Sequence, residues 1–184
     1  ARFVQRHRPH LFSSTPMLVA GVEQRRVPLA TLGANDSVVA TSIDFASVVQ
    51  NILRLLPDTI DIAVVIGNSP IEQFWLEQIR DAVQPHTNHV AFTWFNDLPF
   101  DAMLKRAAAL PPKSAIFFFS LAVDAAGISH EGEKSLVGLR AVANAPIFTY
   151  IDTNFGNGIV GGPLISVNDT AQQTASVAMR ILSG

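Results

Sequence analysis

The sequence contains no cysteine among its 184 residues. This absence excludes disulfide bonds, thiolate catalysis and cysteine-ligated metal sites, although it fixes no compartment. Charged residues make up only 15% of the chain, and the formal net charge of -2 gives no general attraction to nucleic acid or anionic lipid. No apolar run reaches the roughly 20 residues that a membrane-spanning helix needs. The chain is nevertheless 48% hydrophobic, so it can bury a substantial core.

The first residues carry the main basic cluster of the sequence, which we interpret as a solvated surface: Arg2, Arg6, His7, Arg8 and His10. No apolar segment of the kind found in a signal peptide follows this cluster. We therefore expect the sequence to be a segment of a longer protein, with any targeting or membrane segment outside it.

Four short apolar runs alternate with amphipathic stripes over residues 60–151. Each run is typical of a buried strand: Ile60–Ile66, Val90–Phe95, Ala115–Ser120 and Ile147–Ile151. After the first run, Ser69, Pro70 and Glu72 form the pattern of a capping box, which predicts a helix with Glu72 outside its apolar face. Apolar strands separated by helices of about three turns predict an α/β fold with a doubly wound parallel sheet.

The flanking regions are less regular. Met17–Val22 is predicted to be a further strand, and residues 23–41 are predicted to be a connection. A helical stripe begins at Phe45, Ile159 and Val160 form a short extended piece, and Asp169 is expected to cap a last helix.

Ligands of such sheets bind outside the carboxyl ends of the strands. The residues that follow the four runs are small, polar and mostly uncharged, which suits hydrogen bonding to a small polar ligand better than catalysis. The candidate ligand-binding residues are Asn68, Ser69, Phe95, Ser120, Asp152, Asn154 and Phe155. Three of them have structural alternatives: Ser69 as a helix cap, Asp152 as a turn former and Phe95 as a core residue.

Three patterns that could indicate catalysis or metal binding are each incomplete in this sequence. Gly156–Gly161 matches G-x-G-x-x-G, but Gly162 and Pro163 follow it instead of a long helix, so it does not predict a nucleotide site. Ser69, Asp124 and His130 stand in the chain order of a hydrolase triad but lack the G-x-S-x-G turn. His86 and His89 have no carboxylate at metal-ligand spacing. We therefore expect no enzyme activity, no cofactor and no metal.

The end of the chain carries a family resemblance. Phe155–Gly162, then Asn168-Asp-Thr-Ala and a helix ending in Ile181-Leu-Ser-Gly184, is similar to the close of type 1 periplasmic binding proteins. It resembles particularly the ABC-transporter substrate-binding group that includes sensor domains of histidine kinases. The resemblance implies that residues 1–40 are the tail end of a first lobe with its connection. Residues 41–184 would then be the Rossmann-like second lobe.

The resemblance also implies a function, namely extracytoplasmic capture of a small, amino-acid-like solute between two lobes. Hinge closure would be coupled to a membrane permease or a sensor-kinase module, with the full-length protein tethered to the membrane. This hypothesis also allows the protein to form a homodimer. Two alternatives stay beside this hypothesis: a small α/β hydrolase or nucleotide-dependent enzyme, and a dimerisation domain that binds no ligand.

Overall fold

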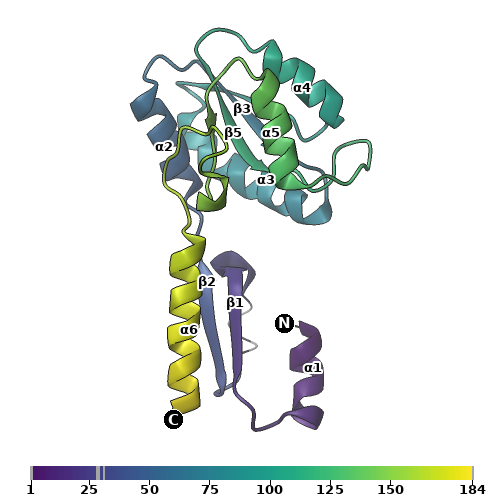
Figure 1. The fold of residues 1–184 in the computed structure, drawn as a ribbon, viewed down its shortest axis with the longest axis vertical. Helices are drawn as coiled ribbons and strands as arrows, with labels where there is room; N and C mark the ends of the chain where they lie inside the picture. Colours follow the sequence, from purple (N-terminus) through teal and green to yellow (C-terminus); the bar gives the residue numbers. More distant parts are fainter. Residues whose placement is uncertain (1, 28–29, 31, 184) are drawn as a thin grey trace. The chain divides into compact units, whose positions relative to one another are not determined.

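A computed structural model of the chain describes residues 2–27, 30 and 32–183, which form two compact units (Figure 1). Unit 1 comprises Ala1–Ile43 and Ile165–Gly184, and unit 2 comprises Asp44–Leu164. The sequence placed a boundary after residue 40, three residues from the observed one. The sequence also assigned the last helix to the second lobe, and this prediction was wrong. The helix contacts the two strands of unit 1 instead.

Unit 1 contains a two-stranded parallel sheet, β1 (Met17–Glu23) and β2 (Asp36–Thr41), with the helices α1 (Arg2–Leu11) and α6 (Val167–Ser183). The predicted connection over 23–41 therefore holds a strand that the sequence analysis missed. The predicted cap of the last helix is also corrected, because the Ser166 hydroxyl accepts a hydrogen bond from the Asp169 N–H at 3.1 Å. Asp169 lies in the first turn of α6 rather than before it.

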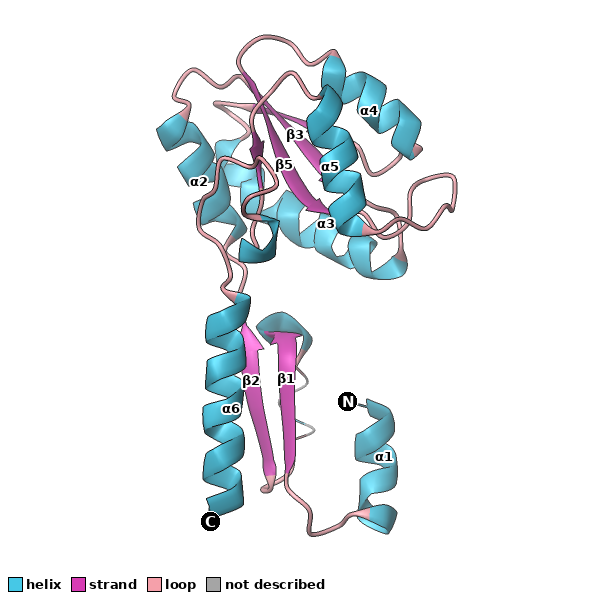
Figure 2. Cartoon of the chain, viewed as in Figure 1, coloured by secondary structure: helices cyan, strands magenta, loops and turns pink. Residues whose placement is uncertain are grey.

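Unit 2 holds four parallel strands in the order β4-β3-β5-β6, with helices between them along the chain (Figure 2). This arrangement confirms the predicted α/β fold with a doubly wound parallel sheet. The elements are α2 (Phe45–Leu55), β3 (Asp61–Ile66), α3 (Pro70–Val83), β4 (Ala91–Trp94), α4 (Phe100–Ala108), β5 (Ser114–Ser120), α5 (Gly132–Val142) and β6 (Ile147–Phe148). The last strand is shorter than predicted. Ile159 and Val160 form no strand, although the Val160 N–H donates to the Ile147 carbonyl at 2.8 Å.

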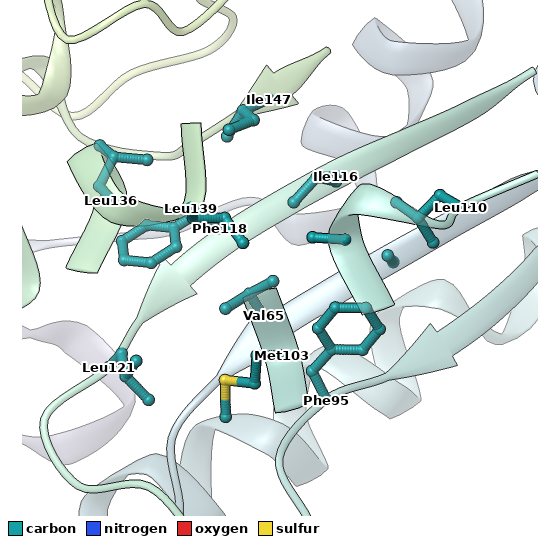
Figure 3. Packing of buried hydrophobic residues seen from close by; sticks show 12 residues of the cluster. Val65, Phe95, Met103, Leu110, Ile116, Phe118, Leu121, Leu136, Leu139 and Ile147 are labelled. Atoms are coloured by element: carbon teal, nitrogen blue, oxygen red, sulfur yellow. The ribbon is translucent and has the colours of Figure 1, made fainter. Parts of the chain in front are cut away.

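Successive side chains of a strand point to opposite sides of the sheet. Helices cover both faces of this sheet, so each face has its own core. On one face, residues of β3 and β5 pack with α4 and α5 in a core that includes Val65, Met103, Phe118 and Leu136 (Figure 3). On the other face, Phe45 of α2 and Trp75 of α3 form an aromatic cluster with Phe117 and Phe119 of β5, with ring centroids 5.7–6.5 Å apart. Ile66 and Phe118 are buried, as the sequence predicts.

Candidate functional site at the carboxyl edge of the sheet

The carboxyl edge of the unit 2 sheet contains a topological switch point between β3 and β5. The chain leaves β3 toward β4 on one side and then crosses to β5 on the other, so the connections after β3 and β5 diverge. Ligands of doubly wound folds bind at such a point. Here backbone hydrogen bonds join the two connections, from Gly67 to Ser120 at 2.9 Å and from Asn68 to Val123 at 2.7 Å.

A buried carboxylate of the protein itself fills this switch point. The side chain of Glu72 is almost completely buried and lies in the first turn of α3. One oxygen, Oε1, accepts from the Ser120 hydroxyl at 2.9 Å and from the Ala122 N–H at 2.7 Å. The other, Oε2, accepts from the Ser69 N–H at 3.1 Å and the Ser69 hydroxyl at 2.7 Å. Glu72 therefore ties the end of β3 to the end of β5.

The electrostatics of Glu72 follow from these bonds. Burial raises the pKa of Glu72, but hydrogen bonds from Ser69, Ala122 and Ser120 lower it by more, so the pKa lies below its ordinary value. The positive end of the α3 dipole also favours the ionised form. Gly67 makes room for this carboxylate, since a Cβ on Gly67 would lie 2.4 Å from Glu72 Oε2.

A second buried carboxylate, Asp124, organises the loop after β5. It accepts from the N–H groups of Phe100, Ala126 and Ile128 at 2.9–3.0 Å, and His130 Nε2 lies 3.0 Å from Oδ2. The first of these bonds satisfies the amino end of α4. Burial raises the pKa of Asp124, but the hydrogen bonds from His130 and the three N–H groups lower it to about 2.

These contacts bear on the hydrolase alternative. Asp124 and His130 do form a pair, as that alternative requires. The Ser69 hydroxyl, however, donates to Glu72 rather than to His130. A nucleophilic serine needs its proton accepted by a base within hydrogen-bond reach, and here a carboxylate with a lowered pKa takes that place. The observed bonds therefore disfavour this triad.

The β6 side of the edge is differently built. The Tyr150 ring stacks on Phe119, with centroids 4.6 Å apart and the planes at 21°. A 3-10 helix, Asp152–Asn154, follows, and Asn154 Nδ2 donates to the buried Thr149 hydroxyl at 2.9 Å. Phe155 comes next and is 68% exposed. This segment combines half-buried polar groups with an exposed aromatic ring.

The glycine-rich stretch after Phe155 does not have the structure of a nucleotide-binding loop. Gly156, Gly158, Gly161 and Gly162 all have positive φ, which L side chains rarely adopt. No helix begins until Val167, which belongs to unit 1. The phosphate cradle of a G-x-G-x-x-G motif needs a helix N-terminus directly after it, and this stretch has none.

The structure separates the predicted ligand-binding residues into three groups. Ser69 and Ser120 meet at Glu72, and Asn68 is exposed beside them, with Oδ1 accepting from Gln73. Asp152, Asn154 and Phe155 lie after β6, on the far side of β5 from β3.

Phe95 forms the third group and requires a correction. It is fully buried in the core beside Val65 and Met103 (Figure 3), and the Arg106 guanidinium lies 5.6 Å from its ring centroid. Phe95 therefore offers no stacking surface to a ligand. The sequence analysis missed Tyr150 and Glu72, although the capping box already marked Glu72.

Two further features are absent from the described part of the chain. No group of three or more His, Asp or Glu side chains among these residues could hold a metal ion. None of the described helices is long and apolar enough to cross a membrane.

Comparison with known proteins supports the fold of the chain. The chain matches no protein-family model and no curated protein. Among solved structures it is similar to a conserved domain protein from Vibrio cholerae O1 biovar El Tor strain N16961, with a TM-score of 0.55 and 19% sequence identity. The match covers 82% of this chain and 49% of the other, so this chain spans about half the length of that protein. At this identity the likeness supports a shared α/β fold alone.

Proposed function

We propose that this chain is a small-solute-binding module of the kind that type 1 periplasmic binding proteins represent, and not an enzyme. One observation carries the proposal. The two buried carboxylates at the sheet edge, Glu72 and Asp124, each accept at least three hydrogen bonds from the protein. They hold the scaffold in place, so the acidic groups most suited to acid–base catalysis are already engaged.

Other polar groups at this edge suit reversible binding. Asn68, Asp152 and Asn154 offer amide and carboxylate groups, and Phe155 offers an exposed aromatic ring. Sites for small polar ligands combine a few placed polar groups with apolar and aromatic surface. We place the ligand contacts of this unit on the β6 side, around Asp152, Asn154 and Phe155. In this proposal the ligand carries an amine or hydroxyl that donates to Asp152.

The cellular setting is part of the same proposal. It rests on the resemblance of Phe155–Gly162 and the last helix to solute-binding proteins and kinase sensor domains. The chain also enters unit 2 once and leaves it once, with unit 1 formed from both flanking segments. A unit inserted in this way can move as a body about its two connections. We therefore propose an extracytoplasmic location and coupling to a membrane permease or a sensor kinase.

The test is calorimetric titration of the protein, at its full natural length, with amino acids and other small polar metabolites. Asp152→Ala should weaken binding by about 1.5–3 kcal/mol, the worth of a hydrogen bond to a charged group. Asp97→Ala is the matched control, because Asp97 is an exposed carboxylate that follows β4 at the same edge. Equal affinity of wild type and Asp152→Ala would refute the placement of the site. If no metabolite binds, and the protein dimerises in solution, the dimerisation alternative replaces this proposal.

A further inference from the structure

A polar cavity in unit 2 is not used by the proposed solute site. Its volume is about 590 Å³, within the range of small-molecule sites, roughly 300–1,000 Å³. It is lined by Ser47, Gln50, Asn51 and Arg54 of α2, and by Gly162 and Pro163. The four α2 residues are three or four positions apart or adjacent, so they form one polar stripe along the helix.

One polar atom in this wall has no partner. Asn51 Oδ1 accepts from Arg54 Nη2 at 3.0 Å, which fixes the orientation of the amide, because a flipped amide would set two donors against each other. The amide nitrogen, Nδ2, is then a buried donor without an acceptor among the described residues. Nearly all buried donors in proteins are paired, so this one marks a place for an acceptor from outside the chain.

The backbone of Gly162 approaches this amide closely. A Cβ on Gly162 would lie 3.0 Å from Asn51 Nδ2, closer than ordinary van der Waals contact. The backbone there also has φ near 146°, which favours glycine. A larger residue would press against the amide that lines the cavity.

The residues that line the cavity indicate which chemical group it can bind. Arg54 is the only formally charged residue among the six, and Gln50 and Asn51 add amide donors. Ser47 offers an oxygen only, since its hydroxyl donates to Asp44 at 2.7 Å. A guanidinium beside two amides suits a group with several acceptor oxygens and negative charge.

We propose that this cavity binds a small molecule through a carboxylate or phosphate group, held by Arg54 and the Asn51 amide. The site joins α2, the first helix of unit 2, to Gly162 and Pro163, near the end of the same unit. A bound oxyanion would therefore hold the beginning of unit 2 to its end. This makes the cavity an effector site beside the two connections, separate from the contacts on the β6 side.

The experiment is an NMR titration of the full chain with inorganic phosphate and, separately, with succinate, following the side-chain amide of Asn51. A saturable shift of this resonance is expected with at least one probe, and the probe that binds assigns the class. Arg54→Gln should weaken that binding about tenfold or more, as expected for loss of a charge-assisted hydrogen bond. Arg180→Gln removes the same charge from the exposed face of α6 in unit 1 and should leave the affinity unchanged.

A second variant guards against a folding defect at Arg54. Gln50 is exposed, so Gln50→Glu should fold normally while adding a negative charge to the cavity wall, and it should weaken binding to a similar extent. The proposal is overturned if neither probe shifts the Asn51 amide at concentrations up to about 10 mM, a very weak affinity. It is equally overturned if Arg54→Gln and Arg180→Gln weaken binding alike, because the effect would then be one of general charge.

Discussion

Replacing Glu72 by glutamine would remove the carboxylate that joins the ends of β3 and β5. At Glu72, Oε1 accepts from the Ala122 N–H and the Ser120 hydroxyl. Oε2 accepts from the Ser69 N–H, the Ser69 hydroxyl and, at 3.4 Å, the Val123 N–H. Glutamine keeps one oxygen and places an NH₂ group at the other. The hydroxyl there can turn and accept from this group, but at least one backbone N–H loses its acceptor whichever way the amide points.

The magnitude follows from this count. An unsatisfied buried N–H costs about 1–3 kcal/mol, and the remaining bonds lose the extra strength that a charged acceptor gives. We expect Glu72→Gln to lower the free energy of unfolding by about 2–4 kcal/mol, a large part of the total for a domain. Urea unfolding followed by circular dichroism measures this value. Glu77→Gln on the exposed face of α3 is the control and should change stability by less than about 0.5 kcal/mol.

Gly67 gives an independent check of the same geometry. In the wild type, Gly67→Ala would force a methyl group against the Glu72 carboxylate, 2.4 Å away. In a Glu72→Ala background that carboxylate is gone, so Gly67→Ala should cost much less there. A double-mutant cycle reports this coupling directly. An equal cost of Gly67→Ala in both backgrounds, or a loss below about 1 kcal/mol for Glu72→Gln, would refute the reasoning.

Two further predictions concern the scaffold. The Asp124 pKa is lowered from 3.8 to about 2, so Asp124 contributes stability that is present above pH 3.8 and is lost as the pH falls toward 2. Asp124→Asn should flatten this acid limb of the stability profile measured by urea unfolding, and an unchanged limb would contradict the assignment. Ile66→Ala and Phe118→Ala should each lower the free energy of unfolding by roughly 2–5 kcal/mol, because both side chains are buried on central strands. A loss below about 1 kcal/mol in either variant would contradict the core packing.

The sequence predicted the sheet of unit 2 well, because its strands are buried on both faces and therefore read as continuous apolar runs. The capping box at Ser69, Pro70 and Glu72 was also predictable, since its pattern is local. Strand β2 was missed for the opposite reason. It follows Gly33 and Asn35, which favour turns, and most of its residues are only half-buried.

The site was less predictable, because its bonds connect distant positions. Glu72 stood outside the apolar stripe of α3 and was assigned to the exposed face. Its partners Ser120 and Ala122 are 48 and 50 residues away, so no local pattern reveals them. Periodicity is misleading elsewhere too: Ile71 of α3 and Val137 of α5 are apolar but are 36% and 48% exposed. A carboxylate three residues after a helix cap can fold back over the helix end, which a stripe of apolar residues does not encode.

The position of Glu72 also limits what the sheet edge can bind. The sequence predicts Ser69 as a ligand contact, and a helix N-terminus at the carboxyl end of a strand favours a carboxylate. The Ser69 hydroxyl, the Ser69 N–H and the Ala122 N–H already donate to a carboxylate of the protein. A second carboxylate at this point would meet like charge and find these donors engaged. Under the proposed function, unit 2 would therefore recognise the amine or hydroxyl end of a solute, through Asp152 and Asn154, rather than its acidic end. If the solute is amino-acid-like, its carboxylate must be bound by groups away from the carboxyl ends of β3 and β5.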